Sequence, residues 1–482
     1  MGTRGTTIMT GSARKATRWV RASLALAVGV AGCNWTKFAD EAEKAPVRSI
    51  SAPSGFDSSD FGKSILPLSS GQGSAAAFVA TSINESHMVL VKIGRDGKVS
   101  SSTVTSSQLI DTDGSAITSL AEVPGSAPTR LLLGTPIVKN QSYGQTYTFD
   151  LPDPAVLAAN PGMSAAGTLA ATKIFAPPLT STTSGMARGL AAGYVAGGAQ
   201  PDYIVGSDDS LAVMVDGPAT AAAPALVAST MLDACEITYD NQQENRYLTR
   251  RPMLAAQLWS DPSAMSQQQI VLGITRSSGG PGKVEFLNVT AGAIKCLAVD
   301  SPATAKPQFG HALVTGDFDG NGKLDLLVGA PPQQAFLYLN FADKPFGTVP
   351  APIEISLPGS VDFGYAVAAL NVDGFGGDEI LISDPRASVG GQMAAGHVLV
   401  YHLDPMTGAL GLPTEIADLA PEANANFGYT VNALPFCSGD CPENAPPGRV
   451  LLVGAANEVF LYYRVGEIPT QMGAPATDVR SP

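Results

Sequence analysis

Charged residues, histidines and long hydrophobic runs are all scarce in this chain of 482 residues. Charged residues make up 15% of it, and only four histidines occur. No Gly-x-Ser-x-Gly elbow, His-Glu-x-x-His pair or phosphate-binding loop is present, so the common motifs of serine hydrolases, zinc proteases and nucleotide-binding proteins are missing. No segment after the first 32 residues is long and apolar enough to predict a membrane-spanning helix.

Acidic residues are absent from the first 32 residues, which contain five basic ones. The apolar run after the last of these basic residues, Ala22–Val30, is too short to span a bilayer. Residues 1–32 are therefore predicted to be a secretory signal peptide. The small residues before Cys33 resemble a bacterial lipobox, which implies cleavage before Cys33, its acylation, and a tether over residues 33–46. Asn34 follows this cysteine instead of Asp, which favours the outer membrane. The alternative is an ordinary signal peptide with a chance cysteine.

The charge of the remaining chain is strongly negative. Without the predicted signal peptide, 24 basic residues stand against 42 acidic ones, a net charge of −18. Such a surface repels nucleic acid and anionic lipid headgroups. We therefore expect no nucleic-acid partner, and membrane attachment only through the lipid anchor.

Apart from Cys33, the chain has four cysteines, an even number that suits an exported protein. Cys437 and Cys441 bracket a short loop and are predicted to pair, which leaves Cys235 to pair with Cys296. The alternative is four free thiols, which an oxidising compartment disfavours. The spacing of Cys437 and Cys441, with no second Cys or His pair nearby, argues against a zinc site.

Many short strands joined by tight turns are predicted by the 51 glycines, the 36 prolines and the short Val-, Leu- and Ala-rich runs. One segment recurs. Phe309-Gly-His is followed by an oxygen-rich loop and by a strand that ends in Gly-Ala-Pro331. Weaker copies begin at Phe61-Gly-Lys, Phe363-Gly-Tyr and Phe427-Gly-Tyr. A repeat of this length indicates a repeated supersecondary unit that must stack on its neighbours.

These segments resemble the FG-GAP repeat of integrin α-subunit β-propellers and their bacterial relatives. The resemblance implies an all-β fold, a seven-bladed β-propeller of four-stranded antiparallel blades. Seven units can be aligned, which places the propeller at residues 47–466 and a flexible tail at 467–482. No outer strand is evident after Tyr463, so we expect residues 47–51 to complete the last blade, as in integrins.

Oxygen-bearing residues crowd a nine-residue loop in the most regular repeat. Five groups are expected to converge on one point: the side chains of Asp317, Asp319, Asn321 and Asp325 and the carbonyl of Lys323. Such an all-oxygen set suits Ca²⁺ and disfavours zinc or copper. An EF-hand would need an acidic residue at position twelve, where Val328 stands, whereas the loop matches the cation loop of the FG-GAP repeat. One structural Ca²⁺ is predicted, and the alternative is a solvated acidic turn.

A second, less complete loop follows in the next unit. Its candidate ligands are Asn371, Asp373, Gly377 and Glu379. Phe375 stands at position five, where a ligand is needed, so a second Ca²⁺ binds weakly here or not at all. In the last unit Cys437 and Cys441 replace the loop, which looks like a covalent substitute for the ion.

A candidate ligand face follows from the residue after each Phe-Gly pair. These residues are Lys63, His311, Tyr365 and Tyr429. In integrin propellers this end of the inner strand lies towards the ligand-binding face, so the four side chains are expected to line a central mouth. The alternative is that they pack between blades or face solvent.

The predicted function is binding. We expect a monomeric, calcium-stabilised envelope lipoprotein that holds a protein or glycan partner, as an adhesion module does. The longest excursions, Leu151–Pro178 and Pro218–Pro252, are the predicted recognition loops. Two alternatives remain open: an enzyme acting on extracellular polysaccharide in the propeller channel, and a purely structural envelope component.

Overall fold

The computed structural model describes residues 47–52, 61–68, 75–81, 87–94, 99–105, 119–126, 129–135, 145–151, 172–175, 189–206, 210–215, 225–231, 252–259, 268–275, 281–290, 293–371, 376–435 and 449–462. These residues all belong to one compact unit, Pro46–Pro482. The predicted signal peptide, Cys33, the tether and the tail lie outside the described residues.

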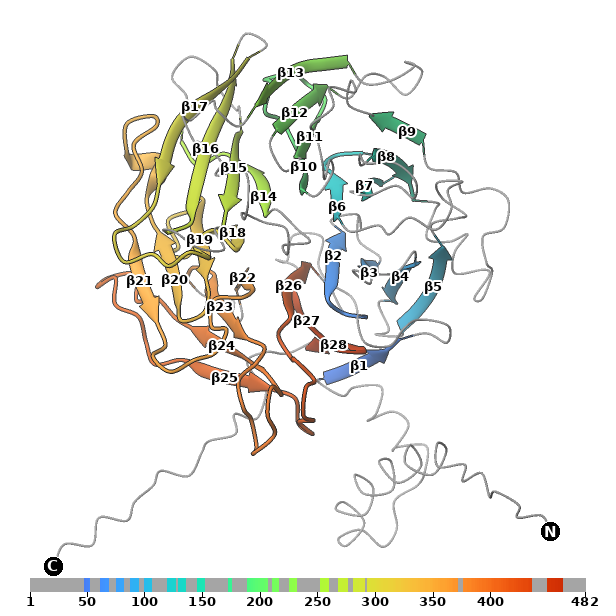
Figure 1. The fold of residues 1–482 in the computed structure, drawn as a ribbon, viewed down its shortest axis with the longest axis vertical. Coiled ribbons are helices and arrows are strands. Elements are labelled where there is room, and N and C mark those ends of the chain that lie inside the picture. Colours follow the sequence, from blue (N-terminus) through green and yellow to red (C-terminus); the bar gives the residue numbers. More distant parts are fainter. Residues whose placement is uncertain are drawn as a thin grey trace, which may run out of the picture. The chain divides into compact units, whose positions relative to one another are not determined.

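Apart from one short 3₁₀ helix, the regular elements of the described residues are strands, and these pair into seven four-stranded antiparallel sheets (Figure 1). Sheets 1 to 3 are β2 (Ser64–Leu68), β3 (Ala75–Thr81), β4 (His87–Gly94) and β5 (Val99–Thr105); β6 (Ser119–Val123), β7 (Arg130–Thr135), β8 (Gln145–Asp150) and β9 (Thr172–Phe175); and β10 (Gly189–Gly193), β11 (Asp202–Gly206), β12 (Ser210–Val215) and β13 (Ala225–Met231).

Sheets 4 to 6 follow the same order. They are β14 (Met253–Ala256), β15 (Gln269–Ile274), β16 (Lys283–Thr290) and β17 (Ala293–Asp300); β18 (Ala312–Gly316), β19 (Asp325–Ala330), β20 (Gln334–Tyr338) and β21 (Ile353–Ser356); and β22 (Val367–Leu370), β23 (Glu379–Asp384), β24 (His397–Tyr401) and β25 (Thr414–Ala417). A short 3₁₀ helix, η2 (Phe341–Asp343), stands between β20 and β21.

Sheet 7 is built from both ends of the described chain. Its inner strands are β26 (Thr430–Pro435), β27 (Arg449–Ala455) and β28 (Glu458–Tyr462), and its outer strand is β1 (Val47–Ser51). β1 pairs antiparallel with β28, with Val47 opposite Tyr462 and Ser51 opposite Glu458. The expectation that residues 47–51 complete the last sheet is therefore confirmed.

The innermost strands close into a ring. β2 contacts β6, and contacts continue through β10, β14, β18, β22 and β26, which returns to β2. Figure 1 shows these strands nearest the centre and the fourth strand of each sheet at the rim. The all-β prediction and the β-propeller prediction are confirmed.

The core lies between the sheets. Within the described residues, seven clusters of buried hydrophobic side chains each join two neighbouring sheets. β19 shows how one strand serves two clusters: Leu326 and Val328 pack towards sheet 4, whereas Leu327 packs towards sheet 6. Successive side chains of a strand point to opposite faces, so a strand buried on both faces reads as an unbroken apolar run.

The recurring Phe-Gly pair forms the joint between neighbouring sheets. Phe309 and Phe363 are fully buried. The glycine after each has a positive φ, +88° at Gly310 and +95° at Gly364. A Cβ on Gly364 would also lie 2.1 Å from the carbonyl oxygen of Gln334 in β20 of the preceding sheet. Conformation and close approach both require glycine here, which explains why the pair recurs.

One prediction about the loops is wrong in part. The segments Leu151–Pro178 and Pro218–Pro252 were expected to be recognition loops, but β9 lies within the first and β13 within the second. Both are fourth strands of their sheets. The remainder of these segments lies outside the described residues, Pro252 and Leu151 excepted.

In the described part of the chain, no helix has the length and apolar character needed to cross a membrane.

Candidate functional site

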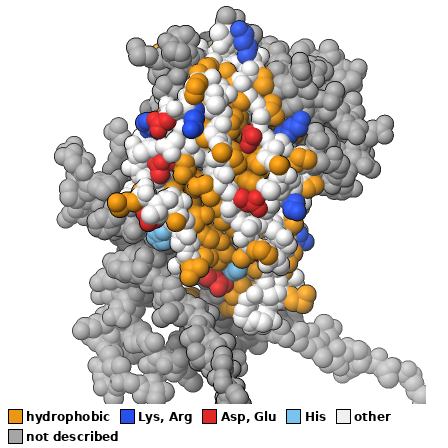
Figure 2. Space-filling model, turned by 90° about the vertical axis from the view of Figure 1, so that its left-hand side faces the viewer, with side chains coloured by type: hydrophobic (Ala, Val, Ile, Leu, Met, Phe, Trp, Pro, Cys, Tyr) orange, Lys and Arg blue, Asp and Glu red, His pale blue; other side chains and the backbone are white. Residues whose placement is uncertain are grey.

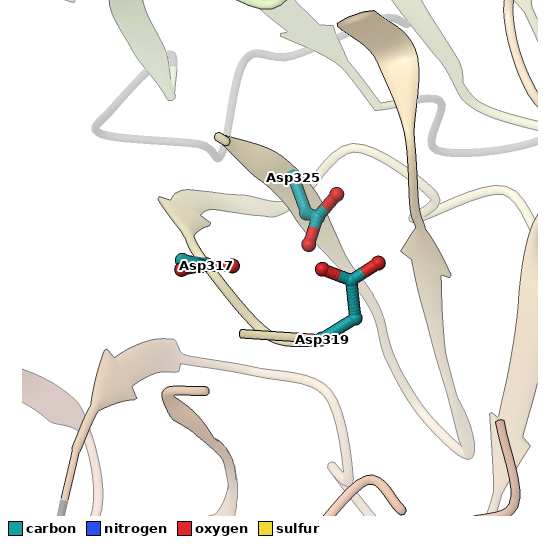
Figure 3. Close-up of side chains that lie close together, drawn as sticks. All are labelled: Asp317, Asp319 and Asp325. Carbon is teal, nitrogen blue, oxygen red and sulfur yellow. The ribbon is translucent and has the colours of Figure 1, made fainter. Parts of the chain in front are cut away.

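The acid loop, residues 317–325, connects β18 to β19 in sheet 5. Its carboxylates come from Asp317, Asp319 and Asp325, and their ligand oxygens lie within 4.8 Å of one another. Figure 3 shows the three side chains gathered at the end of the hairpin, with Asp325 at the start of β19. Among the described residues, these three carboxylates are the one group of at least three possible metal ligands that lie close enough together to hold an ion.

Hydrogen bonds from the backbone shape the loop. Gly322 donates its N–H to Asp317 Oδ2 at 2.8 Å, and Asn321 donates its N–H to Asp319 Oδ1 at 3.2 Å. Lys323 donates its N–H to Asn321 Oδ1 at 2.8 Å. Gly322 has φ +80° and nothing within 4 Å of an added Cβ, so it is the turn geometry that favours glycine here.

Asp325 is the buried member of the cluster, with no exposed surface. Its two carboxylate oxygens accept the backbone N–H of Phe318 at 3.1 Å and of Asn340 at 2.8 Å. Burial, together with the negative charges of Asp319 and Asp317, raises the pKa of Asp325 to about 7, although both hydrogen bonds act in the opposite direction. A cation beside the loop would offset both causes of this rise.

A second observation, on the carboxylate of Asp317, also indicates that these residues fit a calcium ion. Asp317 Oδ1 is buried and has no hydrogen-bond partner. A buried oxygen without a partner is costly, and ligation of a metal removes that cost. The neighbouring Lys323 ammonium does not neutralise the cluster, because it pairs with Asp343 in η2 at 2.5 Å.

The residue that begins the second strand, Asp325 in sheet 5, has the same hydrogen-bonding role in two other sheets, which sequence reasoning missed. In sheet 3, Asp202 is fully buried and accepts the N–H groups of Val195 at 2.9 Å and Ala196 at 2.7 Å. In sheet 4, Gln269 accepts the N–H of Leu258 at 2.9 Å in the same way. The nine-residue spacing from Tyr194 to Asp202, with two glycines between them, was the available signal.

In the corresponding loop of sheet 6, the described groups bond to protein. Asn371 Nδ2 donates to the carbonyl oxygen of Gly377 at 3.2 Å, and Glu379 Oε1 lies 3.0 Å from His402 Nδ1. Asp373 lies outside the described residues, so a second metal site here stays a prediction.

The residues predicted to form a ligand face do come together. We call Lys63, His311, Tyr365 and Tyr429 the aromatic arc; they precede the inner strands of sheets 1, 5, 6 and 7, which are consecutive around the ring. The ring centroids of His311 and Tyr365 are 4.6 Å apart, and those of Tyr365 and Tyr429 are 4.9 Å apart. Lys63 Nζ lies 5.4 Å from the centroid of Tyr429, within cation–π range.

The orientation of the His311 ring is fixed by the backbone carbonyl of Tyr365 at the start of the next sheet. Its Nδ1 lies 2.9 Å from the carbonyl oxygen of Tyr365. A carbonyl oxygen only accepts, so Nδ1 carries the proton and Nε2 is the acceptor atom of the neutral ring. All four side chains of the arc are half-buried. The arc therefore offers aromatic edges and a cation at the opposite end of the inner strands from the acid loop.

Of the predicted disulfide cysteines, Cys296 in β17 is described and is disulfide-bonded. Cys235, Cys437 and Cys441 lie outside the described residues, so the predicted pairings stay predictions. The bonded state of Cys296 speaks against four free thiols.

Comparison with known proteins identifies the repeat. Residues 309–338, which include the acid loop, match the family model of the FG-GAP repeat. The chain is 26% identical to human integrin alpha-IIb over 213 residues, 41% of this chain and 19% of the integrin. It is 27% identical to mouse integrin alpha-IIb over 175 residues, 32% of this chain and 16% of the integrin. The chain thus matches about a fifth or less of the length of these relatives. The sheet topology is that of a β-propeller, and within it the chain is similar to the FG-GAP repeat at residues 309–338 and to integrin alpha-IIb.

Proposed function

We propose that this protein is a calcium-stabilised binding module that holds a protein partner at the aromatic arc, as part of an adhesion or docking system of the cell envelope. In this proposal each of the seven sheets is one blade of a seven-bladed propeller. The chain is exported and anchored through acylated Cys33. The propeller acts as a monomeric rigid scaffold, and the similarity to integrin alpha-IIb is consistent with protein binding.

The observation that carries the proposal is the arc itself. Four successive blades each contribute one half-buried side chain, and the three rings and the ammonium contact one another in series. Aromatic side chains that combine an apolar body with a polar group are enriched at protein interfaces. The equivalent position of each blade is therefore used for one continuous surface.

On the one side of the ring that Figure 2 draws, the surface chemistry suits a protein better than a polyelectrolyte. In Figure 2, on the side where β17 and β21 lie in Figure 1, hydrophobic side chains form a band and charges of both signs are scattered between them. No large field of one sign is visible on this face. A surface of this kind suits apolar and hydrogen-bonded contacts with a protein.

The calcium ion has a structural role in this proposal. Asp317, Asp319, Asn321 and Asp325 and the carbonyl of Lys323 would hold it. When bound, it would neutralise carboxylates that otherwise repel one another at the turn of the hairpin. Because the acid loop and the arc stand at opposite ends of the same strand, β18, the ion would stabilise the scaffold without touching the partner.

The proposal is tested by affinity capture from envelope extracts with three proteins: the wild type, the double variant Tyr365→Ala/Tyr429→Ala, and the exposed control Met406→Ala. We expect a protein that the wild type and the control retain and the double variant loses, followed by direct binding of that purified protein. If no retained protein distinguishes the double variant, and the wild type instead degrades an envelope polysaccharide, the enzyme alternative replaces this proposal.

A further inference from the structure

The acid loop of sheet 5 lies against the corresponding loop of sheet 6, where Asp378 bonds Asp317 twice. Asp378 donates its backbone N–H to the carbonyl oxygen of Asp317 at 2.6 Å. In return, Asp378 Oδ2 accepts the backbone N–H of Asp317 at 3.1 Å. The first residue of the acid loop is therefore held at both of its backbone polar groups from the neighbouring sheet.

The two loops meet backbone to backbone. A Cβ on Gly377 would lie 2.5 Å from the carbonyl oxygen of Phe318 and 2.6 Å from that of Asp317. A Cβ on Gly320 would lie 3.0 Å from the backbone nitrogen of Gly377. The two loops can approach this closely only because each has a glycine, which lacks a side chain, where they meet.

The other described groups of the sheet 6 loop fix the segment 376–378 in place. Asn371 Nδ2 bonds the carbonyl oxygen of Gly377, and Glu379 is paired with His402. These groups occupy the first, seventh and ninth positions of the loop, the positions from which the acid loop would offer oxygens to an ion. Here they are bonded to protein and support the residues that contact Asp317.

Asp317 is the ligand residue with most to gain from such support. Its Oδ2 accepts the N–H of Gly322, and its buried Oδ1 has no hydrogen-bond partner. A ligand whose backbone is already fixed loses less freedom when the metal binds, and residues that orient ligands commonly change metal affinity when replaced. Asp378 is also a fourth acidic side chain beside the cluster.

We propose that Asp378 is a positioning residue for the ion site of sheet 5, and that the incomplete loop of sheet 6 braces this neighbouring site. The inference rests on the proposed calcium site and extends it across the boundary between two sheets. It also gives residues 376–378 a role that does not need a second ion.

The test is calcium titration by calorimetry of the purified full chain in four forms: wild type, Asp378→Ala, Asp378→Asn and the control Asp404→Ala. Asp404 is exposed, lies between β24 and β25 of sheet 6, and accepts a backbone N–H from Met406 at 2.8 Å. Asp378→Ala should weaken calcium affinity by about tenfold or more. Asp378→Asn keeps an acceptor oxygen and should lose less, and Asp404→Ala should bind as the wild type does.

The outcomes separate the two proposals. A wild type that takes up no Ca²⁺ overturns the calcium site and this inference with it. A wild type that binds, with Asp378→Ala within about twofold of it, overturns the inference and leaves the calcium site standing. Should Asp378→Ala not fold, hydrogen exchange on the wild type decides: calcium must slow exchange at the amides of Asp317 and Asp378, and unchanged exchange there overturns the inference.

Discussion

Gly329 in β19 packs against the carbonyl oxygen of Gly364 at the start of the next sheet, so closely that a Cβ on Gly329 would lie 2.2 Å from that oxygen. The contact recurs around the ring, because a Cβ on Gly273 would lie 2.0 Å from the oxygen of Gly310, and one on Gly454 1.8 Å from that of Gly62. The Phe-Gly pair of one sheet thus packs on a glycine next to the last residue of the second strand of the previous sheet. The two parts of the repeat are coupled across the boundary between sheets.

This coupling predicts a large cost for a small substitution. Gly364→Ala adds a Cβ 2.1 Å from the oxygen of Gln334 and forces a positive φ on alanine, so we expect at least about 3 kcal/mol of destabilisation. Gly359→Ala is the matched control, since Gly359 also has a positive φ, +85°, but nothing within 4 Å. It should cost only about 1–2 kcal/mol. Thermal and denaturant unfolding measure the loss of stability in both variants. Equal losses would contradict the close contact between sheets at Gly364.

The predicted calcium site can be tested by comparing two buried aspartates, Asp325 and Asp202, which both stand at the ninth position of their loops. Asp325→Ala and Asp202→Ala each leave two backbone N–H groups without their acceptor, so each should destabilise the protein by about 1–3 kcal/mol. Only Asp325 belongs to the carboxylate cluster. Removing calcium with a chelator should therefore lower the melting temperature of the wild type and of Asp202→Ala, but leave Asp325→Ala unchanged. A wild type that does not respond to the chelator would remove the metal from the scaffold.

The sequence predicted the strands that the Phe-Gly motif marks and missed two fourth strands that no motif marks. Phe309, Phe363 and Phe427 located the inner strands of sheets 5 to 7 because burial and a positive φ leave little choice of residue. β9 and β13 were hidden, because a fourth strand at the rim can be short or alanine-rich.

The contact of Asp378 with Asp317 could not be read from the sequence for a different reason. It joins residues 61 positions apart in two sheets, and no periodicity reports a bond of that kind. Asp202 was recoverable in principle, since its spacing from Tyr194 matches the acid loop, but the loop has lost the other ligands that would have marked it.

Closure of the ring by β1 predicts that a few residues near the start of the propeller stabilise the whole. Ile50 of β1 packs against the cluster shared by sheets 7 and 1, and β28 would become an edge strand without β1. Deletion of residues 47–52 should lower the melting temperature more than any single exposed substitution and should promote aggregation. Met406→Ala, at a side chain 94% exposed, is the control and should change neither. An unchanged melting temperature after the deletion would show that the ring is held without β1.

Asp202 predicts a pH dependence of stability that is independent of calcium. Burial raises the pKa of this carboxyl above its ordinary value, although the hydrogen bonds from Ala196 and Val195 act in the opposite direction. The folded protein therefore binds this proton more tightly than the unfolded chain does. The resulting stabilisation is complete below the ordinary carboxyl pKa of about 4 and is lost as the pH rises through the folded-state value.

Asp202→Asn removes this titration and keeps an oxygen that can accept the same N–H groups. The melting temperature of the wild type, relative to the variant, should thus be most favourable at low pH and should fall as the pH rises. Asp404 gives the opposite sign, because the backbone N–H of Met406 lowers the pKa of that exposed carboxyl. For Asp404→Asn the wild type should lose its relative stability as the pH falls. If the difference between wild type and Asp202→Asn does not change with pH, the buried carboxyl is not perturbed in the way its surroundings require.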